Sequence, residues 1–149
     1  MFVVALFALP IAISDWRYRR IPNIYLIFMG YLLFIARTVT GLASLKVLMV
    51  AFFAVILLTL LSRMGVGDAK LLIVELVALN PVNYGELVAF AICLYVGALI
   101  QITLMVLLAG SLPRSIPLAV GIFIGTALYL AANSAQFLQQ YADALVNSW

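Results

Sequence analysis

The fold is decided by residues 14–23, which read Ser14-Asp15-Trp16-Arg17-Tyr18-Arg19-Arg20-Ile21-Pro22-Asn23. Residues 2–14 form an apolar run, and an aspartate and three arginines come directly after it. A signal peptide carries its positive charges before its apolar run, so this run is typical of a first transmembrane helix instead. Pro22 suits the first turn of a second helix, because proline lacks the amide donor that a helix start leaves unused. Asn23 is expected to support the bend at this position.

The composition of the 149-residue chain is that of an integral membrane protein. Hydrophobic residues make up 68% of it and charged residues 9%, whereas soluble domains carry roughly 25% charged residues. The length accommodates about six spans of roughly 20 residues each, which leaves no room for a separate soluble domain. We therefore predict an all-α polytopic fold of about six transmembrane helices, forming a single domain over residues 1–149.

Turn residues and apolar runs together locate the helices. The expected spans are residues 2–14, 22–40, 44–62, 68–79, 86–110 and 116–133. In the last stretch, residues 134–149, four apolar side chains stand four positions apart: Phe137, Tyr141, Leu145 and Trp149. A stripe of this kind predicts a short helix that lies in the membrane interface.

The basic residues predict the orientation of the chain. With the amino end outside, three connections lie in the cytoplasm and hold Arg17, Arg19, Arg20, Arg63, Lys70 and Arg114. Only Arg37 and Lys46 then lie outside, in agreement with the positive-inside rule. Asp15 and Asp68 are thereby placed at the cytoplasmic face of an inner membrane. Because the helices that carry them are the shortest, both carboxyl groups should be drawn below the headgroups into a cavity that admits water.

The residue inventory excludes several kinds of chemistry. The chain has no histidine and one cysteine, Cys93, so histidine-assisted nucleophiles, histidine-ligated zinc and internal disulfides are ruled out. We expect neither a cofactor nor a catalytic metal. Nucleic acid is not an expected partner, because the basic residues gather in turns rather than along one helix face.

Asp15 and Asp68 are the candidate catalytic residues, since ionisable groups in a membrane usually mark function. Two adjacent carboxyl groups can share a proton, so that one activates a water while the other polarises the scissile carbonyl. Taken singly, Asp68 is typical of a helix cap and Asp15 of an interfacial salt bridge. As a same-side pair they favour catalysis. Gly65 and Gly67 are expected to let the backbone turn tightly beside them.

Helix ends suggest which aspartate holds the shared proton. Asp68 is expected at the amino end of its helix, where the dipole favours a negative charge, and Asp15 near a carboxyl end, where the dipole disfavours one. This contrast predicts Asp68 as the general base and Asp15 as the proton-holding partner.

The segment Gly65-Val66-Gly67-Asp68-Ala69-Lys70-Leu71-Leu72 resembles the GxGD signature of the type IV prepilin peptidases. The motif around Asp15 resembles the first aspartate motif of their small branch, which serves tight-adherence (Flp) pili. The resemblance covers about residues 1–130 and implies the GxGD intramembrane aspartyl protease fold. It also implies a leader peptidase that removes the short basic leader of membrane-inserted prepilins and pseudopilins. The larger branch carries a cytoplasmic segment with zinc-binding cysteines, linked to N-methylation; nothing here corresponds to it, so cleavage without methylation is expected.

Other residues have two readings each. Lys70 either binds an acidic substrate group or snorkels to the interface. Glu75 either tunes the site or, as we favour, bonds to a neighbouring helix, and Cys93 is expected to pack within its helix. Residues 116–125 are similar to a proline- and glycine-rich motif of the larger branch without its Phe-Gly-Pro core, and Gly121 and Gly125 are typical of a small-xxx-small packing face.

Two alternative functions remain at this point. A preflagellin-type or other GxGD protease would keep the aspartate pair and change the substrate. A small transporter would instead use Asp15 and Asp68 as a proton or cation relay, although such a relay normally needs further polar residues through the spans.

Overall fold

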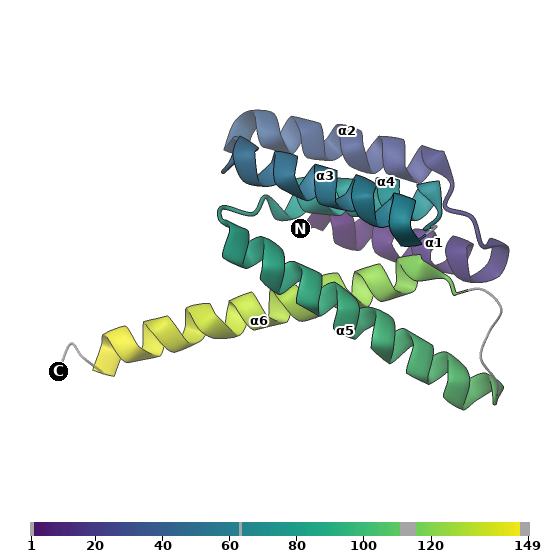
Figure 1. Ribbon diagram of the computed structural model, residues 1–149. Helices are drawn as coiled ribbons and strands as arrows, with labels where there is room; N and C mark the ends of the chain where they lie inside the picture. The colour runs from purple at the N-terminus through teal and green to yellow at the C-terminus, as the bar shows by residue number, and fades with distance from the viewer. Residues whose placement is uncertain (1, 63, 111–115, 147–149) are drawn as a thin grey trace.

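A computed structural model describes residues 2–62, 64–110 and 116–146. All the regular structure in this part of the chain is helical, which confirms the predicted all-α fold of six helices (Figure 1). The helices are α1 (Phe2–Tyr18), α2 (Asn23–Thr40), α3 (Leu45–Ser62), α4 (Val66–Leu79), α5 (Tyr84–Ala109) and α6 (Leu118–Val146).

The helix α6 is longer than the sequence predicted. It runs without a break from Leu118 to Val146, so the expected end near residue 133 and the separate helix from 134 are wrong. Residues 134–146 contain neither glycine nor proline, and nothing else there supplies a stop signal. Trp149 lies outside the described residues. The interfacial location of the C-terminal part stays a prediction.

Within the described part of the chain, four helices are long and apolar enough to cross a membrane: α2, α3, α5 and the first 18 residues of α6. The two helices that carry the aspartates are shorter, with 17 residues in α1 and 14 in α4. The predicted shortness is confirmed for α4, whereas α1 extends to Tyr18, past the predicted end at residue 14, and is only one residue shorter than α2 and α3. At 1.5 Å per residue α4 rises only about 21 Å, against a hydrocarbon thickness of about 30 Å.

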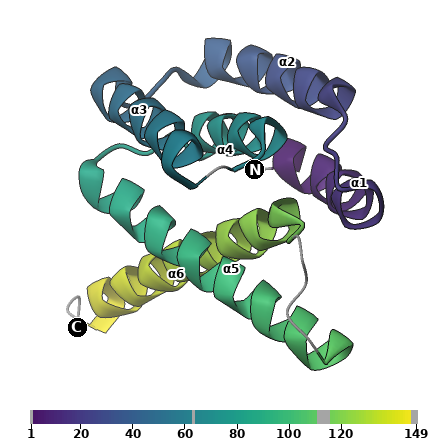
Figure 2. The ribbon, with the colours of Figure 1, turned by 45° about the vertical axis from the view of Figure 1, so that its right-hand side comes forward.

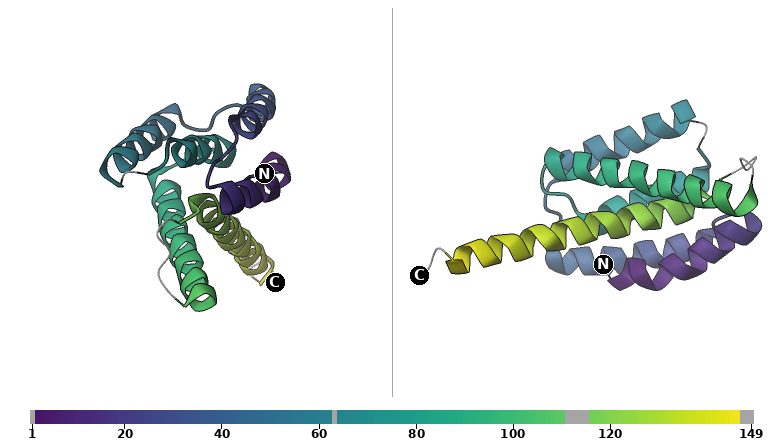
Figure 3. Two further views of the ribbon diagram at one scale, coloured as in Figure 1. Left: turned by 90° about the vertical axis from the view of Figure 1, so that its right-hand side faces the viewer. Right: turned by 90° about the horizontal axis from the view of Figure 1, so that it is seen from below.

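The helix α4 lies at the centre of the molecule, packed against α2, α3 and α6, while α1 packs against α2 and α6. The pair α5 and α6 crosses below this group in Figure 1 and projects away from it in the end-on view of Figure 3. Because α6 contacts both α1 and α4, its first turns reach the helices that carry Asp15 and Asp68.

Glycines allow the close crossing of α5 and α6, in which α5 passes in front of α6 in Figure 2. A Cβ at Gly97 would lie 2.5 Å from the main-chain nitrogen of Gly125 and 2.6 Å from the main-chain oxygen of Gly121. The two backbones therefore touch directly, with no room for a side chain. The prediction that Gly121 and Gly125 form a packing face is confirmed.

Candidate functional site

The end of α1 presents the first aspartate. The amide of Arg19 donates to the carbonyl of Asp15, 2.9 Å away, and Arg19 takes the left-handed conformation with φ 54°. The hydroxyl of Ser14 donates to the carbonyl of Arg20 at 3.1 Å. A left-handed residue other than glycine costs about 1 kcal/mol, and here it turns the chain sharply, directly after the turn that holds Asp15.

The carboxylate of Asp15 is buried, with 5% of the residue exposed. Its Oδ2 accepts a hydrogen bond from the main-chain amide of Ala119, 3.0 Å away, in the first turn of α6. The sequence did not predict this contact. Every residue except proline has a main-chain amide, so the sequence cannot indicate which amide will bond to the carboxylate.

The second aspartate lies in the first turn of α4 rather than at its cap. The helix begins at Val66 and its N-cap residue is Gly65, so the expectation that Asp68 caps the helix is wrong. Asp68 is half-buried, and the free amides of the first turn favour a negative charge at its position.

The two glycines of the motif have a different role from the predicted one. Gly65 has an ordinary extended conformation with φ −61°, and Gly67 lies within α4, so neither is needed for a tight turn. A Cβ at Gly65 would instead lie 2.9 Å from Oδ2 of Asp68. Gly65 therefore leaves space for the carboxylate, whereas a Cβ at Gly67 would meet Ile21 at 3.5 Å, an ordinary contact.

Asp15 and Asp68 line one cavity of about 350 Å³, as their predicted same-side placement requires. The other lining residues come from the segment after α1 and from the start of α4: Arg19, Arg20, Ile21, Asn23, Gly65, Val66, Gly67 and Lys70. The negative charge of Asp15 disfavours the charged form of Asp68, and the positive charge of Arg19 favours the charged form of Asp15. Two carboxyl groups that line the same partly enclosed cavity influence each other's ionisation.

Lys70 and Asn23 join two walls of this cavity. The ammonium of Lys70 donates to the side-chain oxygen of Asn23 at 3.2 Å, which links the start of α4 to the start of α2. Pro22 has φ −63° and is the N-cap residue of α2, which begins at Asn23, one residue later than predicted. The bond between Lys70 and Asn23 therefore connects two parts of the cavity lining.

Glu75 is not among the residues that line the aspartate cavity. It is fully buried, and its Oε2 accepts from the hydroxyl of Thr126 on α6 at 3.4 Å. This confirms the favoured expectation of a bond to a neighbouring helix. Cys93 packs against the core, as predicted.

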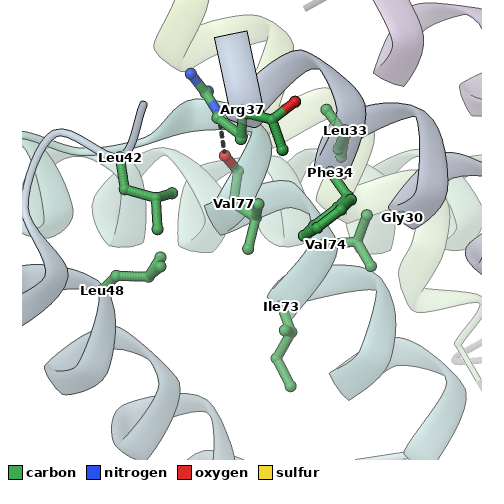
Figure 4. A pocket seen from close by; sticks show the side chains of 10 residues that line it. Gly30, Leu33, Phe34, Arg37, Leu42, Leu48, Ile73, Val74 and Val77 are labelled. Atoms are coloured by element: carbon green, nitrogen blue, oxygen red, sulfur yellow. Dashed lines mark hydrogen bonds between the residues drawn. The ribbon is translucent and has the colours of Figure 1, made fainter. Parts of the chain in front are cut away.

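A second cavity, of about 360 Å³, lies at the other end of α4, between α2 and α4 (Figure 4). Its walls are apolar except for Arg37 and Thr38. The guanidinium of Arg37 donates to the carbonyls of Val77 and Ala78, at 3.1 and 2.6 Å. These are carbonyls of the last turn of α4, so Arg37 anchors a helix end and brings no reactive group.

The chemistry available at the first cavity is that of carboxyl groups. Within residues 2–62, 64–110 and 116–146, no three histidine, cysteine, aspartate or glutamate side chains are grouped as metal ligands. Among comparisons with known proteins, the family model described as the type IV leader peptidase family matches residues 2–132. No curated protein and no solved structure matches the chain.

Proposed function

Because the chain belongs to the type IV leader peptidase family, we propose that Asp15 and Asp68 are the catalytic pair of an aspartyl endopeptidase. The observation that carries the proposal is their shared cavity. The residues that line it offer no histidine, serine or cysteine, so a nucleophile activated by histidine is not available there.

The cavity supports a mechanism in which water is the nucleophile. One carboxylate takes a proton from the water while the water oxygen bonds to the scissile carbonyl carbon. The other carboxyl group is protonated and donates a hydrogen bond to the carbonyl oxygen. The tetrahedral intermediate then collapses, the carbon–nitrogen bond breaks, and the leaving amine takes the proton held by the base. Each step uses only the two aspartates and the water.

We assign the base to Asp15, contrary to the expectation from helix ends. That expectation compared the start of α4 with the end of α1. The start of α6 also faces Asp15, and the Ala119 amide bonds to its carboxylate. A hydrogen bond to the charged form favours that form, so Asp15 accepts the water proton and Asp68 holds the shared one.

The proposed substrate is a membrane-inserted prepilin of the Flp type or a related pseudopilin, cleaved at the cytoplasmic face of the inner membrane. The basic residues Arg17, Arg19, Arg20 and Lys70 lie at the aspartate end of the chain, which supports that orientation. The short connections between helices and the lone Cys93 support cleavage without N-methylation.

The test is co-expression with candidate prepilins and a mass measurement of the pilin product. We expect loss of the leader without an added methyl group. Asp15→Asn and Asp68→Asn should each abolish cleavage while the protein still inserts. Glu75→Gln, which changes a carboxyl group outside the cavity, should keep substantial activity. Cleavage by either aspartate variant would contradict the pair.

A further inference from the structure

Gln101 is a buried amide in the second half of a mostly apolar helix. It lies in α5, is 2% exposed, and donates from Nε2 to the main-chain carbonyl of Pro117. The space for its head group comes from α6, because a Cβ at Gly121 would lie 2.5 Å from Oε1 of Gln101. A polar side chain with little water around it is costly in a membrane unless it has a task.

The bond that Gln101 makes holds the start of α6. Pro117 is buried and directly precedes α6, which begins at Leu118. Two residues after Pro117, the amide of Ala119 donates to Oδ2 of Asp15 at 3.0 Å. The same short segment is therefore bound by Gln101 through a carbonyl and by Asp15 through an amide.

These two bonds act on one rigid unit. Only Leu118, the first residue of α6, lies between the Pro117 carbonyl and the Ala119 amide, so a displacement of one bonded atom moves the other. The position of the amide that stabilises the Asp15 carboxylate thus depends on a side chain that belongs to α5. This dependence is strengthened by the contact between the α5 and α6 backbones at Gly97 and Gly125.

We propose that Gln101 is a positioning residue, which holds the start of α6 so that the Ala119 amide stays on the Asp15 carboxylate. The inference rests on the proposed function of Asp15. No residue of α5 is among those that line the aspartate cavity. The inference therefore gives α5 an indirect part in the reaction.

The first test is Gln101→Met, which keeps the length of the side chain and removes the donor. We expect kcat for prepilin cleavage to fall about tenfold, the effect of losing roughly one hydrogen bond from the reacting geometry. KM should stay unchanged, because Gln101 does not line the cavity that would receive the scissile bond. An unchanged kcat, or a rise in KM with an unchanged kcat, overturns the inference.

Two control variants separate positioning from stability. Thr103→Val alters a residue two positions along α5, whose hydroxyl bonds only to the carbonyl of Leu99 in the same helix; kcat should not change.

Phe90→Leu removes packing against Tyr129, whose ring centroid lies 5.5 Å away. It should lower the thermal unfolding midpoint and leave kcat unchanged. If Phe90→Leu lowers kcat as much as Gln101→Met at equal loss of stability, the role of Gln101 is structural only.

A measurement that needs no substrate keeps this inference distinct from the proposed function. Amide hydrogen exchange of the purified protein should be several-fold faster over residues 116–123 in Gln101→Met than in the unmodified chain. Unchanged exchange overturns the inference even if the enzyme cleaves prepilins. Failure of the unmodified protein to cleave any prepilin instead refutes the function and leaves the exchange result standing. If the methionine variant does not insert, Gln101→Asn, one methylene shorter, is expected to give the same changes.

Discussion

At the scale of single residues, Gly65 and Gly67 provide a matched pair. A Cβ at Gly65 would stand 2.9 Å from Oδ2 of Asp68, whereas one at Gly67 would meet Ile21 at 3.5 Å. We therefore expect Gly65→Ala to reduce the single-turnover rate of leader cleavage about tenfold or more, since the carboxylate must move from its place. Gly67→Ala should stay within about twofold of the unmodified enzyme. A larger loss in Gly67→Ala than in Gly65→Ala would contradict the assigned role of Gly65.

Also at this scale, the assignment of the shared proton is testable. We expect the protonated-acid stretch seen by infrared difference spectroscopy at neutral pH to belong to Asp68, because the hydrogen bond from the Ala119 amide favours the charged form of Asp15. Asp15→Asn and Asp68→Asn spectra identify the band, with the changed titration of the surviving carboxyl group taken into account. Assignment of the band to Asp15 would restore the order predicted from the helix ends.

At the scale of helices, the crossing of α5 and α6 depends on its glycines. A Cβ at Gly97 would lie 2.5 Å from a main-chain nitrogen of α6, and a backbone atom has no other rotamer to adopt. Gly97→Ala should therefore separate the helices and destabilise the protein by about 1–3 kcal/mol, measured as a lowered midpoint of thermal unfolding in detergent. Gly30→Ala on α2 is the control, since nothing lies within 4 Å of the added carbon. Equal midpoints for the two variants would contradict this account of the crossing.

At the scale of the whole molecule, the distribution of basic residues predicts the orientation in the membrane. In a Cys93→Ala background, Tyr18→Cys at the aspartate end should react with an impermeant maleimide only from the cytoplasmic side. Val39→Cys, at the far end of α2, should react only from the outside. Both positions are exposed, at 63% and 84%. Labelling of Tyr18→Cys from outside would invert the topology.

The same scale shows what the sequence could predict. Apolar runs and turn residues predicted all six helices, although not the end of α6, and the predicted topology placed Asp15 and Asp68 on one side, as the shared cavity bears out. The bond from Ala119 and the space at Gly65 could not be predicted, because they depend on how helices distant in sequence meet. One signal was overlooked: Gln101 is a polar residue deep in an apolar helix, and a residue of that kind points to a partner.

The shortness of α4 has a consequence for biogenesis. This helix carries Asp68, Lys70 and Glu75 within 14 residues, and a charged residue near a span centre costs about 2.5–3.5 kcal/mol on insertion scales. The segment thus gains too little from lipid to enter the bilayer alone. Its neighbour α3, with a mean hydropathy of 2.5, enters readily and packs against it. We therefore expect α4 to settle only once α6 brings Thr126 to Glu75, so that the helix that carries Asp68 is among the last to reach its place in the fold.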